Sequence, residues 1–451
     1  MLITTFNKTI NKQVYSIKEE RKLMTRFMIA ARSRGEMDLK LYLGTYEFSV
    51  VPRSLFAADG TLYSCQDKSK VAKALYDLQV EETPAPSNDK KVIIFNGMAV
   101  VNRISIKKMK LKTCRNFAEK FVEIIYDDSN GYDEIRIIFD LYESASLKNK
   151  TRATRTKGLT PIRYKITDDT PIGYLTTRKL LSHIETKNEL TKFLAKKIEE
   201  SMMRSYVVVY QHSCITNLSD LNPELRNYSQ EEADTGIILH SIDVAKRDPF
   251  CDLTIKCSDT DVLLLLLHYF KDLPSTTTFE TNEKKKFLLG QLSECIGEEK
   301  CAALLGFHAI TDCDQTGSFN GFSKEKCWKS FMSSDVLILN AFSNLGSNLD
   351  NSVKDGIENY VIRLYADNLP QINNFAKTVD SLADLRYQMV LKSQSESEKL
   401  PPTKSALVQK ILRAHYTAMV WKLSHIPSPE LPVIQKTMVG NLTPFIIFTS
   451  Q

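Results

Sequence analysis

Acidic side chains recur where predicted strands end or predicted helices begin, and such side chains could hold metal ions. Asp259 and Asp261 follow a β-rich run at 252–257, and Asp140 ends another at 134–139. The full set is Asp140, Glu231, Glu232, Asp234, Asp259, Asp261, Asp312 and Asp314. Carboxylate oxygens are the hard ligands that Mg²⁺ and Mn²⁺ prefer, and two such ions about 3.5–4 Å apart can support phosphodiester cleavage by water. Because so many anions in one place would repel each other, a shared site requires cations.

Each acid also has a simpler interpretation as part of a turn or a helix start. Asp259 can cap the helix that follows it, and the acids at 231–234 suit a first helical turn, where the helix dipole favours anions. Asp312 and Asp314 can accept hydrogen bonds from turn amides. For any single position this interpretation is the more frequent one, whereas the recurrence of acids on successive elements favours a shared site.

The elements that must position these acids alternate between strand and helix. Runs rich in β-branched and aromatic residues predict strands at 91–95, 134–139, 206–210 and 252–257. The intervening stretches are typical of helices, notably 116–126, 175–200 and 231–246. This alternation predicts an α/β fold with a central, mostly parallel sheet covered by helices. The carboxyl ends of such strands form the edge where ligands bind, so we expect Asp140, Asp259 and Asp261 there.

A polar, Pro-containing segment at 81–89 predicts the first domain boundary. We therefore expect an N-terminal helical extension and linker at 1–87, a central α/β domain at 88–332 and a mainly helical C-terminal region at 333–451. Helical composition also predicts helices at 15–31 and 284–295.

The composition is that of an ordinary globular protein. Of 451 residues, 43% are hydrophobic and 25% charged, with a net charge of +6, which permits nucleic-acid binding without demanding it. The nine cysteines include no Cys-x-x-Cys pair, which indicates a reducing, intracellular compartment, nuclear or cytoplasmic. No secretory signal is evident, and no apolar run reaches the roughly 18 residues of a membrane span, so we expect no membrane partner.

A basic tract follows the strand that ends at Asp140. It contains Lys148, Lys150, Arg152, Arg155 and Lys157. In a nuclease these side chains would bind the phosphates of a strand that enters the acidic edge. The alternative is a solvated helix face, and salt-sensitive binding would separate the two interpretations.

Three motifs resemble those of known nucleases. Ser258-Asp-Thr-Asp-Val262, Glu232-Ala-Asp234 and Phe139-Asp140 are similar to motifs of the flap-endonuclease and xeroderma-pigmentosum-G family, which has a PIN-like fold. A closer resemblance is to uncharacterised animal proteins linked to mobile elements. Those proteins carry Glu-Glu-Ala-Asp, Ser-x-Asp-Thr-Asp-Val and Gly-x-His-Ala-Phe-Thr-Gly-Cys-Asp, and this chain has Glu231-Glu-Ala-Asp234 and Gly306-Phe-His-Ala-Ile-Thr-Asp-Cys-Asp314 at the first and last of these.

The resemblance implies a structure-specific nuclease that uses Mg²⁺ or Mn²⁺, with two ions when active, on DNA or RNA. The ligands that it implies are Asp140, Glu232, Asp234, Asp259, Asp261 and Asp314, with Glu231 and Asp312 as support. One departure is Asn96, which follows the first core strand where the family has an Asp ligand. A second departure is Asp312, which replaces the glycine before Cys-Asp. Protein partners are not indicated.

Two other classes of function are compatible with the same residues. Asn96 favours a catalytically inactive PIN-like module that binds nucleic acid or protein. A metal-dependent phosphomonoesterase would instead turn over small phosphate esters without a polymer. Cleavage assays on oligonucleotides and small esters discriminate between the three.

Overall fold

The computed structural model describes residues 3–10, 13–20, 23–34, 37–49, 51–64, 69–80, 90–142, 160–313, 315–368, 379–393, 397–432, 435–438 and 444–447. The chain forms two compact units. The sheet unit comprises Leu75–Cys301 and Leu423–Glu430, and the helical unit comprises Met1–Ala74, Ala302–Lys422 and Leu431–Gln451. Residues 302–332, which the sequence analysis placed in the central domain, thus fall in the helical unit, and the three-part division stays a prediction.

The sheet unit is built on a seven-stranded sheet with the order β6-β5-β4-β3-β7-β8-β9. Its strands are β3 (Lys91–Asn96), β4 (Glu134–Ile138), β5 (Ser205–Tyr210), β6 (Ser213–Thr216), β7 (Asp252–Lys256), β8 (Thr278–Glu280) and β9 (Lys286–Leu288). The inner pairs from β5 to β8 are parallel, whereas the edge strands β6 and β9 are antiparallel to their neighbours. The predicted α/β class with a mostly parallel sheet is therefore confirmed.

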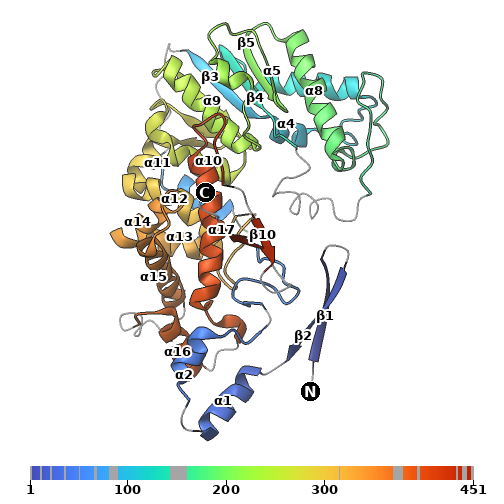
Figure 1. Cartoon of the computed structure of the whole chain (residues 1–451). Helices are drawn as coiled ribbons and strands as arrows, with labels where there is room; N and C mark the ends of the chain where they lie inside the picture. The colour runs from blue at the N-terminus through green and yellow to red at the C-terminus, as the bar shows by residue number, and fades with distance from the viewer. Residues whose placement is uncertain are drawn as a thin grey trace. The chain divides into compact units, whose positions relative to one another are not determined.

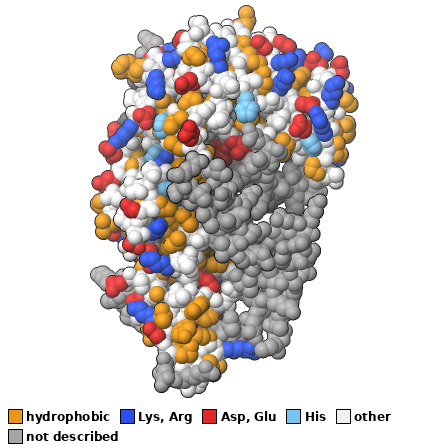
Figure 2. All heavy atoms as spheres, viewed as in Figure 1, with side chains coloured by type: hydrophobic (Ala, Val, Ile, Leu, Met, Phe, Trp, Pro, Cys, Tyr) orange, Lys and Arg blue, Asp and Glu red, His pale blue; other side chains and the backbone are white. Residues whose placement is uncertain are grey.

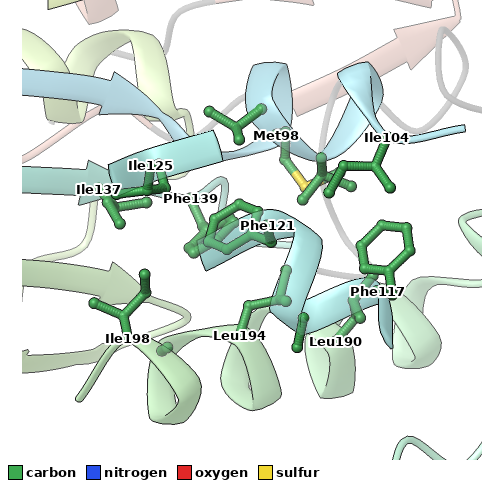
Figure 3. Close-up of a cluster of buried hydrophobic side chains, with 14 of the residues drawn as sticks. Met98, Ile104, Phe117, Phe121, Ile125, Ile137, Phe139, Leu190, Leu194 and Ile198 are labelled. Atoms are coloured by element: carbon green, nitrogen blue, oxygen red, sulfur yellow. The ribbon is translucent and has the colours of Figure 1, made fainter. Parts of the chain in front are cut away.

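One face of this sheet carries the main apolar core, which Figure 3 shows in close-up. Its helices include α4 (Gly97–Arg103), α5 (Cys114–Asp128), α7 (Thr177–Leu180) and α8 (Ile184–Ser201). On α8, Leu190, Leu194 and Ile198 recur every four residues and are all buried, so one stripe of the helix faces the core. Phe121 of α5 stacks on Phe139, which follows β4. This stacking fixes the chain just before Asp140.

The opposite face is covered by α9 (Ala233–Arg247) and α10 (Thr260–His268), and Figure 1 shows α9 across the sheet from α5 and α8. A buried ion network holds α9 to β4. Arg136 donates to Glu134 at 2.8 Å and to Asp243 of α9 at 2.7 Å, and all atoms of the Arg136 and Glu134 side chains are inaccessible to solvent. Since buried charges require partners, this network holds the C-terminal half of α9 on β4.

The remaining described elements of the sheet unit are short. They are α11 (Leu289–Ile296) and the 3₁₀ turns η1 (Pro223–Arg226) and η2 (Phe270–Asp272). Two helices cross the unit boundaries in the sequence: α3 (Ser69–Tyr76) and α12 (Glu298–Thr311).

The helical unit consists mainly of helices that pack on one another. Its helices are α1 (Leu23–Arg34), α2 (Leu39–Thr45), α13 (Lys324–Met332), α14 (Val336–Asn344), α15 (Asn351–Asn368), α16 (Leu382–Ser393), η3 (Ser397–Lys399) and α17 (Lys404–Lys422). The unit also contains two antiparallel strand pairs: β1 (Ile3–Ile10) with β2 (Gln13–Glu20), and β10 (Gln435–Met438) with β11 (Pro444–Ile447). The helices α14 and α15 approach so closely that a Cβ at Gly356 would lie 2.4 Å from that of Ala341.

Most elements predicted for the sheet unit are confirmed, but two helix predictions are wrong in part. Residues 15–20 of the predicted N-terminal helix form β2, because they pair with β1 instead of winding. Residues 286–288 form the edge strand β9 before α11 begins at Leu289. The predicted linker at 81–89 lies outside the described residues.

Candidate active site

The carboxyl ends of three adjacent parallel strands form the edge where the sequence analysis placed the site. The central strand β3 lies between β4 and β7. Its last residues set the register, with Asn96 opposite Ile138 of β4 and Phe95 opposite Lys256 of β7. Neighbouring strands are about 4.8 Å apart, so the residues that follow these pairs emerge side by side. Asn96, Asp140 and Asp259 are three of those residues.

Asp140 joins the end of β4 to the start of α9. Its Oδ1 accepts a hydrogen bond of 2.9 Å from the backbone N–H of Ala233, and its Oδ2 accepts one of 3.1 Å from the hydroxyl of Tyr142. The next residue, Leu141, donates its N–H to the carbonyl of Glu231 at 2.8 Å. Although Glu232 is the N-cap residue of α9, its side chain makes no capping bond, so Asp140 supplies the acceptor.

A glycine permits the close approach of α9 to β4. A Cβ at Gly236 would lie 3.0 Å from Ile138 Cγ2 and 2.8 Å from the hydroxyl of Tyr228. Asp234 lies in the first turn of α9 and is buried. The helix start thus brings the motif Glu231–Asp234 against the end of β4, beside Asp140.

Asp259 caps α10, as the simpler interpretation predicted. Its Oδ1 accepts a hydrogen bond of 3.0 Å from the N–H of Asp261, and Asp261 lies in the first turn of the helix. Capping uses a backbone donor and does not remove the negative charge. The cap therefore fixes the position of a carboxylate at the end of β7, and the shared-site interpretation of Asp259 stays a prediction.

Cys257 links the acids of α9 to those of α10. Burial, and then the carboxylates of Asp234 and Asp259, raise the pKa of the Cys257 thiol well above its ordinary value. Both carboxylates therefore lie close enough to one buried sulfur to act on it electrostatically. Acids from β4, α9 and the β7–α10 junction thus gather on one edge of the sheet. Figure 2 shows acidic side chains grouped near the middle of the viewed face.

Asn96 occupies the third strand end with a neutral side chain. Its Oδ1 accepts a hydrogen bond of 3.0 Å from the N–H of Ala99, so it acts as the N-cap of α4. An amide caps a helix as well as a carboxylate does, but it brings no charge to the edge. Asn96 therefore stands at a strand end on this edge without adding an anion to it.

The donors at this edge are carboxylate and amide oxygens, which fit Mg²⁺ or Mn²⁺ better than softer metals. Within the described ranges, no group of three or more His, Cys, Asp or Glu side chains is placed so that it could hold a metal ion. Asp314 and the basic tract Lys148, Lys150, Arg152, Arg155 and Lys157 lie outside the described residues. The oxygen chemistry of the edge fits a hard divalent ion.

Asp312 belongs to the helical unit, just after α12. Its side chain is 1% exposed, and neither carboxylate oxygen has a hydrogen-bond partner among the residues that the structure describes. The ammonium of Lys324 instead donates to the backbone carbonyl of Asp312 at 3.2 Å. Asp312 is therefore a buried acid, which the turn-amide interpretation did not anticipate.

Comparisons with known proteins add one distant likeness. No protein-family description matches the chain, and no curated protein does either. A solved structure that is similar is the flap endonuclease of bacteriophage T5, a pseudo-enzyme–product complex with DNA and metal ions. The likeness has a TM-score of 0.35 and 9% sequence identity, and covers 72% of this chain and 99% of that one.

The structure also adds site residues that the sequence analysis missed. Tyr142 bonds Asp140 from two residues further along, and Cys257 lies between Asp234 and Asp259 in their electrostatic field. Neither residue belongs to an acidic motif; their only sequence signal is that Tyr142 follows a predicted strand and Cys257 ends one. In the described part of the chain, no helix is long and apolar enough to cross a membrane.

Proposed function

We propose that the chain is a divalent-metal-dependent phosphodiesterase that acts on DNA or RNA. The observation that carries this proposal is the gathering of acids from three elements on one edge of the sheet. Asp140 bonds the start of α9, which carries Asp234, and the carboxylates of Asp234 and Asp259 act on the same thiol of Cys257.

Within the sheet unit, the ion would be held by Asp140, Glu232, Asp234, Asp259 and Asp261, with Glu231 as a supporting group. When bound, Mg²⁺ or Mn²⁺ activates water and stabilises the leaving oxygen of a phosphodiester. The residues around the ligands orient them: Tyr142 holds Oδ2 of Asp140, and the N–H of Asp261 holds Oδ1 of Asp259. The basic tract from Lys148 to Lys157 is proposed to bind backbone phosphates.

A cleavage assay tests the proposal. Labelled single-stranded and branched oligonucleotides are incubated with the protein in Mg²⁺, in Mn²⁺ and in EDTA, beside a small phosphate ester. We expect cleavage of the oligonucleotides with either ion and none in EDTA. Asp259→Asn with Asp261→Asn removes two charges while an asparagine at 259 keeps the helix cap, so activity is lost and the fold is kept.

The matched control is Asp248→Asn with Asp252→Asn. Asp252 begins β7 at the opposite end of the strand, and Asp248 ends α9. The control variant loses the same charge and should cleave like the wild type. Cleavage that survives the Asp259 and Asp261 substitutions would show that another site is responsible, and turnover of the small ester alone would favour a phosphomonoesterase.

Asn96 favours a second candidate, a catalytically inactive module that binds nucleic acid or protein. Asn96 ends the central one of the three strands, and its amide brings no negative charge for a metal ion. Its side-chain oxygen already accepts a hydrogen bond as the N-cap of α4. The discriminating variant is Asn96→Asp, because aspartate caps a helix equally well and adds only the charge. Cleavage that appears only in Asn96→Asp supports the inactive module, whereas cleavage by the wild type excludes it.

A further inference from the structure

A basic groove lies along α8 in the sheet unit, among elements that the proposed catalytic edge does not use. It has a volume of about 540 Å³ and is lined by Arg163, Lys165, Ile166, Glu189, Lys192, Phe193 and Lys196. Four cations and one carboxylate therefore surround an aromatic ring. In Figure 2, Lys and Arg side chains, with acidic ones among them, lie over the part of the view where Figure 1 draws α8.

The sequence of α8 produces one wall of this groove. While Leu190, Leu194 and Ile198 face the core, Glu189, Lys192, Phe193 and Lys196 lie three or four residues apart on the adjoining stripe. Both lysines are exposed, and Phe193 is half-buried against the edge of the core. The helix therefore presents an anchored ring between two mobile cations.

The other wall is the extended segment 160–166, which two backbone bonds tie to α8. Tyr164 donates its N–H to Thr186 Oγ1 at 2.9 Å, and Ile166 donates its N–H to Glu189 Oε2 at 3.1 Å. The other oxygen of Glu189 accepts a bond of 3.1 Å from Arg163, which keeps the guanidinium at the rim. The one carboxylate of the groove is thus committed to holding the wall in place.

Three of the cations are not committed to acids. Within the described residues, none of Lys165, Lys192 and Lys196 forms an ion pair, and all three are exposed. By contrast, the adjacent Lys197 pairs with Asp168 and Glu200, and its ammonium lies 5.5 Å from the centre of the Phe193 ring. The Phe193 ring therefore contacts the core and the Lys197 ammonium, and it also lines the groove.

From this arrangement we infer that the groove binds single-stranded nucleic acid. Phosphates pair with Lys165, Lys192, Lys196 and Arg163, and a base stacks on Phe193. Stacking on an aromatic ring beside a cationic track is how proteins bind single strands without regard to sequence, and a rigid ring lowers the entropy that binding costs. An anionic ligand without bases would have no group that stacks on the Phe193 ring. The inference rests on the proposed function only in taking nucleic acid as the partner. A catalytically inactive protein would bind a single strand in the same way.

Fluorescence anisotropy with a labelled 12-nucleotide single strand in EDTA tests the inference, since hydrolysis is then absent. Lys192→Glu with Lys196→Glu should weaken binding at least tenfold at low salt. The dependence of log affinity on log salt should also become shallower by about 1.4, which is about 0.7 for each lost phosphate contact. The matched control is Lys246→Glu with Lys284→Glu, which makes the same change of charge at two exposed lysines outside the groove and should bind like the wild type.

The ring is tested separately with Phe193→Leu, which keeps an apolar side chain against the core; a thermal melt confirms that the variant folds. We expect affinity to fall about five- to a hundred-fold while the salt dependence stays the same. A second strand with abasic sites should bind the wild type and Phe193→Leu equally. Equal binding of the intact and abasic strands by the wild type would overturn the inference in favour of a simple anion surface.

The outcome is independent of catalysis, because binding is measured in EDTA and neither Asp259 nor Asp261 lines the groove. If the groove variants bind normally while the wild type cleaves, the groove inference fails and the nuclease proposal stands. If the groove variants lose binding and no protein cleaves, the nuclease proposal fails and the groove stands.

Discussion

Asp140 Oδ1 lies 2.9 Å from the backbone nitrogen of Ala233 and accepts its N–H. One carboxylate therefore ends the segment after β4 and caps α9, although the two residues are 93 positions apart in the chain. The bond places the start of α9 at the carboxyl edge of the sheet. It also means that the structural and the chemical roles of Asp140 can be separated by experiment.

We expect Asp140→Asn and Asp140→Ala to differ in stability and to agree in activity. Asparagine keeps an oxygen for the N–H of Ala233, whereas alanine leaves that N–H without its acceptor and lowers the free energy of unfolding by about 1 kcal/mol. Both substitutions remove a proposed metal ligand, so both should abolish cleavage. Urea denaturation and the oligonucleotide assay measure the two effects, and a fully active Asp140→Asn would remove Asp140 from the site.

Mg²⁺ should stabilise the wild type and fail to stabilise Asp259→Asn with Asp261→Asn. An ion that binds only the folded state at a hundred times its dissociation constant adds about 2.7 kcal/mol to the free energy of unfolding. The double variant loses two of the charges that bind it. Because fewer anions repel each other, this variant should also melt higher than the wild type in EDTA.

Calorimetry in Mg²⁺ and in NaCl of equal ionic strength measures this effect. Asp248→Asn with Asp252→Asn provides the control and should keep the full Mg²⁺ shift. A shift of equal size in NaCl would mean that the ion screens surface charge and occupies no site.

The central strands could be predicted from the sequence because their residues carry one simple signal. Val92 to Phe95 are all buried, and the run is apolar throughout, as expected for a strand covered on both faces. The strands β6, β8 and β9, at or next to the edges of the sheet, have only three or four residues each, too few to show alternation. In β2, Lys18 to Glu20 resemble a helix in composition, and only pairing with β1 makes them a strand.

The positions of Asp140 and Asp259 at strand ends could be predicted from the sequence, but not their contacts. The rule that strand ends share an edge brings Asp140 and Asp259 together once the strand order is known. The bond between Asp140 and Ala233 depends on where α9 packs on the sheet. Several other elements, including β6 and η1, lie between β4 and α9 in the sequence, so this position could not be predicted. Cys257 had no motif to mark it. The sequence also could not show which lysines of α8 lack an ion pair, because ion pairing depends on the folded structure.

Gly97→Ala should destabilise the protein through Phe139. A Cβ at Gly97 would lie 2.5 Å from two ring carbons of Phe139, closer than such atoms pack. Phe139 is itself fixed by stacking on Phe121, so the ring cannot move away without cost. We expect a loss of about 1–3 kcal/mol in the free energy of unfolding, as for other overpacked cores.

A double-mutant cycle identifies the cause. Phe139→Leu removes the ring that meets the new methyl group, so Gly97→Ala should cost less in that background, with a coupling of at least about 0.5 kcal/mol. Urea denaturation of the four proteins measures it. Additive losses would place the strain of Gly97→Ala elsewhere, in the backbone of α4.

Glu134 should make the protein sensitive to acid. Burial opposes its ionisation, but Arg136, Lys90 and Arg247 outweigh this effect and lower the pKa of the carboxyl from 4.5 to about 2. In the unfolded chain Glu134 takes up its proton near pH 4.5, so between pH 4.5 and 2 the unfolded state binds more protons. The contribution to stability is therefore complete above pH 4.5 and is lost as the pH falls towards 2.

Glu134→Gln should thus lower the free energy of unfolding by about 3 kcal/mol at pH 7, and the gap to the wild type should close below about pH 4. Burial also lowers the pKa of His240, whose charging in acid destabilises both proteins and cancels in the comparison. Urea denaturation at pH 7, 4, 3 and 2.5 measures the gap, and the exposed Glu185→Gln serves as the control, with a small and constant difference. A gap for Glu134→Gln that stays constant over this whole pH range would mean that the substituted amide destabilises the protein through its shape and not through the lost charge.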